Sequence, residues 1–302
     1  MAQKSSANGT YRIDELGDKM RIEMVETSLG CPEGCKSCGA YDDYRLENMK
    51  VIELSEEKLY KHLTQIVGKQ RKRLIDWFNN CVTTYVNTEP LRTNNFPFFA
   101  ELVNSESGGK SKVVAISHGV IAGNKKMRLR LEKIVELMEK GIIPRFVLTA
   151  DFARRGGTMS DDENLRHYLE TLEILRPALR KVHISVQGFN EKGEGPDSLS
   201  RSAKMIEDVL SRMHLTHEED VNLGRTGRTY TSLGRAAKVL GDNVITRCSV
   251  IPDNAFVIMA LHKSHRWRGF IRFDGSAYAQ YLDDHMKSYN EVLSYPWTKI
   301  KL

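Results

Sequence analysis

The chain has 302 residues, which is enough for one large core or two modest ones, and a single α/β barrel of this length is common. Charged residues make up 28% and aromatic residues 8%, and neither a long apolar run nor an apolar N-terminal segment occurs, so we expect a cytoplasmic protein without a membrane span or secretory signal. The formal net charge of +6 would suit an anionic partner, but Lys and Arg are spread along the chain, so this signal is weak.

The first half of the chain alternates between strand and helix patterns. After a polar tail over residues 1–18, the alternating apolar positions of "MRIEMVETS" (20–28) predict a strand that leads into a cysteine-containing loop. Ser55 is a suitable N-cap for a helix that extends towards Trp77 and Phe78. A β-branched segment (81–90) that ends at Pro90, a short helix near 96–103 and an apolar strand (113–119) are expected next.

The same alternation continues to about residue 213. Expected elements are a helix over 127–141 closed by Gly141, a strand over 142–151, a helix over 161–180 capped by Ser160, a strand over 181–188 and a helix over 198–213. Strands that alternate with helices of about 12 to 15 residues indicate βαβ units and a parallel sheet, either open or closed into a barrel.

From about Thr216 the composition changes. Residues 217–242 are rich in Gly and Arg, residues 243–275 have the pattern of short strands joined by turns, and residues 276–293 are expected to form a helix. We therefore divide the chain into the tail (1–18), a βα array (19–215) and a C-terminal extension that packs on it (216–302).

Three of the five cysteines, Cys31, Cys35 and Cys38, lie in the short segment "SLGCPEGCKSCGA". This crowding does not match the even-numbered framework of a disulfide-bonded secreted domain. Three thiolates on a tight loop can hold three corners of a four-iron cluster and leave the fourth iron open. A structural zinc site needs four ligands, and the nearest further candidates are His62 and Cys81.

The spacing Cys31-x₃-Cys35-x₂-Cys38, directly after the first strand of a βα array, resembles the signature of the radical S-adenosylmethionine (radical SAM) superfamily. The resemblance implies a [4Fe-4S] cluster whose open iron is chelated by SAM, and reductive cleavage of SAM to a 5′-deoxyadenosyl radical. It also implies a partial (β/α)6 TIM-like barrel with a small α/β C-terminal extension.

Further matches to the family follow along the chain. Asn87-Thr88-Glu89-Pro90 is similar to the family's Gly-Gly-Glu-Pro, which holds the SAM amino group, although Asn87 and Thr88 replace both glycines. The segment "SLGRAAK" (232–238) resembles a Gly-Arg-Ala element that many members carry late in the chain. By resemblance the cofactor-binding residues are Glu89, Thr88, Thr149, Arg154 (or its neighbour Arg155), Ser185 and Gln187, with Asp151 beside them.

Two departures from the family matter. Ser37 stands before Cys38 where an aromatic residue is common, and the C-terminal extension holds only Cys248, so no auxiliary cluster is expected. Candidates for a direct role in the reaction are His118, which ends a predicted strand, and Cys81 and Cys248, which could otherwise be small buried hydrophobes.

The sequence therefore predicts an enzyme that abstracts hydrogen from a second substrate, which is a peptide, a natural-product or cofactor precursor, or an RNA. An external one-electron reductant is required. Two alternatives remain open: an electron-transfer protein, and a zinc- or iron–sulfur-binding module without catalysis. The second would bind nucleic acid through the basic, aromatic segments 224–235 and 262–273. A solvated basic face is the favoured explanation of these segments, because no recognised nucleic-acid fold motif is present.

Overall fold

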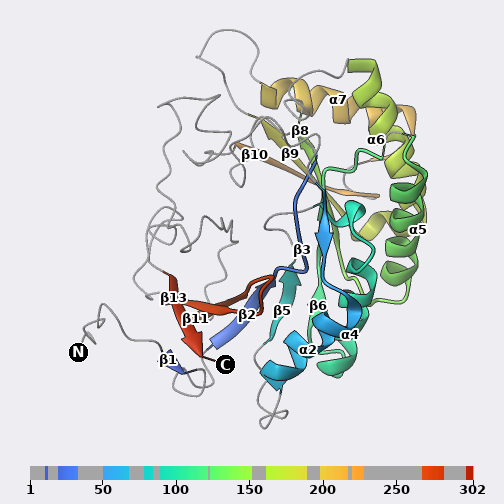
Figure 1. Cartoon of the computed structure of the whole chain (residues 1–302). Helices are drawn as coiled ribbons and strands as arrows, with labels where there is room; N and C mark the ends of the chain where they lie inside the picture. The colour runs from blue at the N-terminus through green and yellow to red at the C-terminus, as the bar shows by residue number, and fades with distance from the viewer. Residues whose placement is uncertain are drawn as a thin grey trace.

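The computed structural model describes residues 11–12, 20–32, 50–67, 78–83, 89–121, 123–151, 161–188, 198–216, 220–227, 267–281 and 297–301. Within these ranges strands and helices alternate as the sequence predicts (Figure 1). The elements of this array are β2 (Met20–Val25), α2 (Glu56–Val67), β5 (Phe78–Thr83), α4 (Phe96–Glu106), β6 (Lys112–Val113), β7 (Ala115–Ser117), α5 (Lys125–Glu139), β8 (Phe146–Asp151), α6 (Asp161–Leu175), β9 (Val182–Gly188), α7 (Ser198–Arg212) and β10 (Asn222–Gly227).

The strands of this array pair in chain order and in parallel. Strand β2 pairs with β5 and β5 with β6 in one sheet, while β7 pairs with β8, β8 with β9 and β9 with β10 in a second. Only Val114 separates β6 from β7, so the two sheets meet at one short segment of chain. The predicted α/β class with a parallel sheet is confirmed.

Helix α5 illustrates why these segments are helical. The Asn124 side chain caps the first turn by accepting hydrogen bonds from the N–H groups of Lys126 and Met127. Gly141 follows the last turn with a φ of 72°, a left-handed conformation that suits glycine. The predicted closure of this helix at Gly141 is confirmed.

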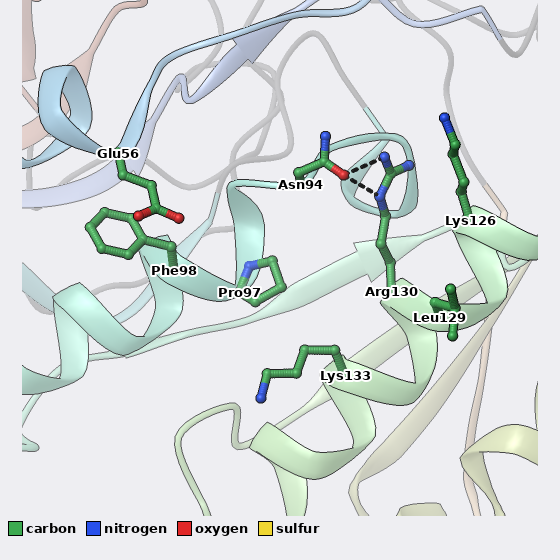
Figure 2. A pocket seen from close by; sticks show the side chains of 8 residues that line it. All are labelled: Glu56, Asn94, Pro97, Phe98, Lys126, Leu129, Arg130 and Lys133. Atoms are coloured by element: carbon green, nitrogen blue, oxygen red, sulfur yellow. Dashed lines mark hydrogen bonds between the residues drawn. The ribbon is translucent and has the colours of Figure 1, made fainter.

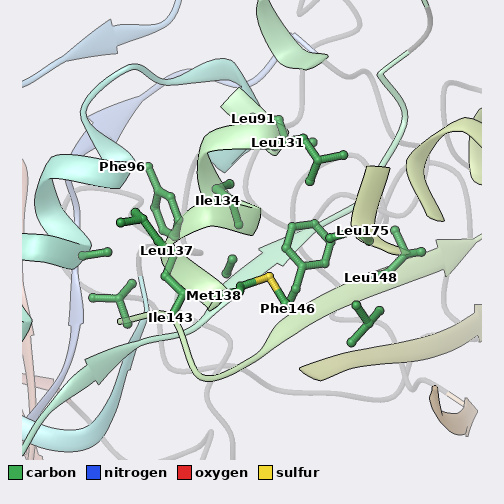
Figure 3. Close-up of a cluster of buried hydrophobic side chains, with 14 of the residues drawn as sticks. Leu91, Phe96, Leu131, Ile134, Leu137, Met138, Ile143, Phe146, Leu148 and Leu175 are labelled. Carbon is green, nitrogen blue, oxygen red and sulfur yellow. The ribbon is translucent and has the colours of Figure 1, made fainter. Parts of the chain in front are cut away.

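The core lies between the β7–β10 sheet and helices α5, α6 and α7, which cover one face of it (Figure 1). Alternate residues of β8 and β9 are fully buried on this face, among them Phe146, Leu148 and Ile184. Leu131, Ile134 and other residues of one α5 stripe pack against them (Figure 3). Burial of this apolar stripe is the main term that fixes the helices on the sheet.

The C-terminal strands extend the sheet at the β2 edge. Strand β11 (Trp267–Ile271) pairs in parallel with β2, and β12 (Ala277–Tyr281) and β13 (Trp297–Lys301) follow as antiparallel strands, with β1 (Tyr11–Arg12) beside β13. Buried Glu26 ties this edge together, because its N–H donates to the Ile271 carbonyl and its carboxylate accepts from the Phe273 N–H.

Four expectations about element positions were wrong. Residues 277–281, expected in a helix, form strand β12, because the tight turn before them pairs them with β11. Phe78 starts strand β5 rather than belonging to the preceding helix, and Pro90 opens a 3-10 helix, η3 (Pro90–Arg92), rather than ending a strand. Strand β10 lies beyond residue 215, in a segment whose Gly and Arg content gave no strand signal.

None of the helices in the described ranges combines the length and the apolar character that crossing a bilayer needs.

Candidate functional site

The structure brings residues predicted at the site to one edge of the parallel strands. Cys31 follows β3 (Ser28–Leu29), Glu89 follows β5 and His118 follows β7. In the neighbouring strands Thr149 lies opposite Ser185 and Asp151 lies opposite Gln187. Carboxyl ends of parallel strands form the binding face in α/β folds, so this edge is the candidate functional site.

Glu89 and His118 form a buried pair at the centre of this edge. Glu89 is 2% exposed and His118 is 3% exposed. The Glu89 carboxylate accepts hydrogen bonds from the N–H of Leu91 at 3.2 Å and from the N–H of His118 at 3.2 Å, and it lies 3.3 Å from His118 Nε2. Two residues that the sequence marked independently are therefore in direct contact.

The tautomer of His118 follows from its second nitrogen. Nδ1 of His118 accepts a hydrogen bond from the N–H of Val120 at 2.8 Å, which requires a lone pair on that nitrogen. The ring proton of the neutral form is then on Nε2, the atom that faces the Glu89 carboxylate. The pair can hold a negative charge on Glu89 next to a neutral imidazole.

The turn that carries His118 is fixed by neighbouring strands and helices. The Thr149 hydroxyl donates to the Ser117 carbonyl at 3.0 Å, and the Thr171 hydroxyl donates to the Gly119 carbonyl. Gly119 has a φ of +69°, and a Cβ at this position would lie 2.1 Å from Leu148 Cδ1. The "SHG" sequence therefore needs glycine at its third position for both conformation and space.

A short antiparallel pair brackets the segment that contains the three cysteines. Strand β3 pairs with β4 (Ile52–Glu53), and the N–H of Leu54 donates to the carbonyl of Thr27 at 3.0 Å. We call residues 27–29 and 52–54 the neck. Cys31, Cys35 and Cys38 all lie between its two halves, and Cys31 is half-buried.

Residues at the start of α4 hold the two halves of the neck together through hydrogen bonds. The side-chain amide of Asn95 donates to the carbonyls of Thr27 and Leu54, one from each half of the neck, at 2.9 and 3.0 Å. The Glu53 carboxylate accepts the N–H groups of Asn94 and Asn95 at 2.7 and 3.1 Å. Asn95 is 4% exposed, so these bonds are shielded from water.

The sequence reasoning missed Glu53, Asn94 and Asn95. Asn95 precedes Phe96-Pro97 at the start of a helix, which is an N-cap pattern, yet its side chain makes no capping hydrogen bond and binds the neck instead. Its partners are 68 and 41 residues away, so no local pattern could reveal them.

Several predicted site residues are not placed. Cys35, Cys38, Thr88, Arg154, Arg155 and Cys248 lie outside the described residues. For Cys81 on β5 and Gln187 on β9 the structure gives the backbone position only. Among the residues that it describes, no group of three metal-ligating side chains occurs, and the thiolate triplet itself is represented by Cys31 alone.

Comparison with known proteins gives weak likenesses only. No family model and no curated protein matches the chain. One solved structure, of BtrN in complex with AdoMet and 2-DOIA, has a TM-score of 0.39 and 13% identity, covering 85% of this chain and 72% of that chain. A structure of TYW1 with a lysine-pyruvate adduct bound has a TM-score of 0.39 and 15% identity, covering 75% and 74%. A crystal structure of SacUVDE has a TM-score of 0.32 and 12% identity, covering 76% of this chain and 79% of that chain. At these TM-scores the likenesses carry no functional argument, so the function must be argued from the residues.

Proposed function

We propose that this chain is a radical SAM enzyme. In this proposal Cys31, Cys35 and Cys38 hold a [4Fe-4S] cluster, and SAM binds beside it at the carboxyl edge of the parallel strands. The observation that carries the proposal is the neck: it places Cys31, the first of the three cysteines, a few residues after the first parallel strand, at the edge where Glu89 and His118 lie.

The strand order supports the barrel form that this function uses. Strands β2, β5, β6 with β7, β8, β9 and β10 follow one another in chain order, which makes six parallel positions. Helices lie between successive strands along the chain, as a partial (β/α)6 TIM-like barrel requires. Strands β11 to β13 then belong to the small C-terminal extension.

The side chains at this edge have the chemical groups that a [4Fe-4S] cluster and SAM would need as ligands. Cys31 offers a thiol, the preferred ligand of iron–sulfur clusters, and Glu89 offers a carboxylate to a positively charged amino group. When bound, the cluster and SAM supply a 5′-deoxyadenosyl radical that abstracts hydrogen from a second substrate.

The protein residues have positioning roles in this proposal. Glu89 caps η3 through its bond from Leu91 and holds it at the end of β7 through its bond from His118, and Asn95 fixes the neck. Thr88, Thr149, Arg154, Ser185 and Gln187 are proposed SAM contacts. Thr149 and Ser185 are neighbours in register, and both are buried polar side chains, two residues before the end of β8 and three before the end of β9.

The second substrate stays open among a peptide, a natural-product or cofactor precursor, and an RNA, and an external one-electron reductant is needed. A zinc- or iron–sulfur-binding module without catalysis is the rival, but it would not need a βα array of this size to hold its metal.

The test is anaerobic reconstitution with iron and sulfide, followed by metal analysis and titration with SAM. We expect about four irons per chain in the wild type and none in the triple variant Cys31→Ala, Cys35→Ala, Cys38→Ala. We also expect SAM to change the electron paramagnetic resonance spectrum of the reduced wild-type protein. The matched control is the double variant Cys81→Ala, Cys248→Ala, which should keep its iron.

Zinc in place of iron, or a cluster whose spectrum does not respond to SAM, would contradict the proposal. Zinc would favour the non-catalytic module, and an unresponsive cluster would favour an electron-transfer protein.

A further inference from the structure

Arg130 lies on the outer surface of helix α5, in the wall of an open, basic pocket of about 510 Å³ that Lys126 and Lys133 also line (Figure 2). All three nitrogens of its guanidinium donate hydrogen bonds. Nε and Nη2 donate to Asn94 Oδ1 at 3.1 and 2.6 Å, and Nη1 donates to the carbonyl of Leu91 at 2.9 Å. The guanidinium therefore holds η3 and the residues after it against α5.

Asn94 connects Arg130 to the neck. Its N–H and its side-chain amide donate to the two oxygens of the Glu53 carboxylate at 2.7 and 3.1 Å. Glu53 lies opposite Ser28 in the β3–β4 pair, and Ser28 is three residues before Cys31. Three residues of extended chain span at most about 11 Å, so this branch of hydrogen bonds ends close to the first of the three cysteines.

Leu91 connects Arg130 to the buried Glu89–His118 pair. The carbonyl of Leu91 accepts from Arg130, and its N–H donates to Glu89 Oε1 at 3.2 Å. The other carboxylate oxygen of Glu89 accepts the N–H of His118 at 3.2 Å. One residue therefore lies between the guanidinium and the carboxylate that is proposed to face the SAM amino group.

The chemistry of arginine suits a residue that joins two branches. Its planar guanidinium holds two acceptors in fixed relative positions, which the single ammonium of lysine does not do. Burial lowers the pKa of the Arg130 guanidinium, the negative charge of Glu53 opposes this lowering, and Arg92 adds to it. The opposite charges of Arg130 and Glu53 thus attract each other across Asn94.

We propose that Arg130 is a positioning residue that fixes the cysteine segment relative to Glu89. This inference rests on the proposed function, in which SAM must reach both the cluster held by the three cysteines and Glu89. The two sites are carried by different elements, the neck and η3, and the bonds of Arg130 lead to each of them through one residue. Without Arg130 every proposed ligand of the cluster and of SAM is still present, but the two sites are held together less firmly.

The test compares Arg130→Met with the matched control Arg128→Met. Methionine keeps an unbranched side chain and a similar helix propensity but has no hydrogen-bond donor. Arg128 is exposed on the same helix, and its guanidinium donates to Glu132 of α5 and Glu170 of α6 instead of the neck or η3. Each variant removes one positive charge, so their net charge is the same.

The first readout is amide hydrogen exchange of the full chain before reconstitution, so it does not depend on a loaded cluster. The N–H of Asn95, which donates to Glu53, reports on the neck branch, and the N–H of Leu91 reports on the Glu89 branch. We expect Arg130→Met to speed exchange at both amides at least about tenfold, because both branches lose a bond to a charged group. The control should change these rates less than about threefold.

Two further variants separate positioning from a general loss of stability. Asn94→Ala removes the link to the neck and leaves the bond between Arg130 and the Leu91 carbonyl, so it should speed exchange at Asn95 and not at Leu91. Arg130→Lys keeps the charge and the stem but not the planar fork, so its rates should lie between those of the wild type and Arg130→Met.

The second readout is the Kd of SAM for the reconstituted protein, measured beside its iron content. We expect Arg130→Met to keep the iron content of the wild type and to raise the Kd about three- to thirtyfold, the range that coupling through a hydrogen-bond network covers. Arg128→Met should change the Kd less than about twofold.

Wild-type exchange at both amides in Arg130→Met, or an equal acceleration in Arg128→Met, would overturn the positioning role. An unchanged Kd of SAM in Arg130→Met would overturn it as well. Wild-type protein that takes up iron and does not bind SAM would instead contradict the proposed function, whatever the exchange rates are, so the two failures are distinguishable.

Discussion

Glu89 and His118, which the sequence marked separately as candidate site residues, are in direct contact in the structure. The sequence marked both because they follow strands, Glu89 by its Glu-Pro pair and His118 by its place at a strand end. It could not show that the two are in contact, because 29 residues separate them and the contact depends on η3 lying next to the end of β7. The burial of the two side chains also depends on the packing of the hydrophobic core next to them, which a local sequence pattern does not show.

Gly119 provides a test of the turn that positions His118. Replacement by Ala adds a Cβ in a left-handed conformation and in contact with Leu148, so we expect Gly119→Ala to lower the free energy of unfolding by about 2–5 kcal/mol. Gly123→Ala is the matched control. Gly123 has a φ of +64° with nothing within 4 Å of the added Cβ. The free energy of unfolding of Gly123→Ala should therefore be only about 1–2 kcal/mol below that of the wild type.

Urea unfolding of both variants measures this difference. Equal losses in the two variants would mean that Leu148 moves aside freely and that the turn is not held by packing.

His62 on α2 gives a pH-dependent prediction. Its ring packs against Gly275 in the β11–β12 turn, 3.2 Å from the position of an added Cβ. Burial lowers the pKa of His62 from its ordinary value of 6.5, Asp274 opposes this, and Lys58 and Lys61 add to the lowering. The unfolded chain therefore binds a proton more readily than the folded protein as the pH falls through about 6.5.

The free energy of unfolding should consequently decrease as the pH falls from about 7.5 to 5.5. The change that one histidine contributes is at most about 1.4 kcal/mol per pH unit. The variant His62→Gln should show a shallower decrease over the same range in urea unfolding. An identical pH dependence in the variant would show that His62 titrates alike in both states.

The neck could not be predicted from the strand and helix patterns of the sequence. Strands β3 and β4 are two residues each, too short for any periodicity, and their pairing depends on Asn95 and Glu53. The sequence predicted a loop around the cysteines but not the contacts that hold its ends.

Asn95→Ala should open the neck. The substitution leaves the carbonyls of Thr27 and Leu54 without the Asn95 donor, so we expect a loss of about 1–3 kcal/mol in the free energy of unfolding. On the proposed function, the variant should also release iron to a chelator faster than the wild type. Asn124→Ala, which removes the α5 cap and about 1 kcal/mol, is the control for stability loss away from the neck.

Iron release is measured after reconstitution, under conditions that are well below the unfolding midpoints of both variants. If Asn124→Ala releases iron as fast as Asn95→Ala, the effect is one of general stability and the neck has no specific role.

Helices and buried strands were predicted well where periodicity was strong. Helix α5 was expected at 127–141 and spans Lys125–Glu139, because its apolar stripe, its cap and Gly141 all agree. Strand β12 was mistaken for helix, because the Ala and Tyr of this segment fit either state and pairing with β11 and β13 decides. Strand β10 was missed because register with β9, rather than composition, makes it a strand.

The chain as a whole is a parallel α/β array to which strands β11 to β13 are added at the β2 edge. The arrangement leaves one edge for Glu89, His118 and the neck, and it places the basic pocket of α5 beside that neck. The net charge of the whole chain does not report how its charges are distributed. It therefore does not show that residues 125–133 contain five Lys and Arg residues.

The formation of 5′-deoxyadenosine from SAM tests the proposed chemistry most directly. Reconstituted protein is reduced anaerobically with dithionite, mixed with SAM and analysed by chromatography, next to the variant Cys31→Ala, Cys35→Ala, Cys38→Ala. We predict 5′-deoxyadenosine from the wild-type protein and none above background from the variant. Wild-type protein that holds its full iron content and still forms no more 5′-deoxyadenosine than the variant would contradict radical SAM chemistry.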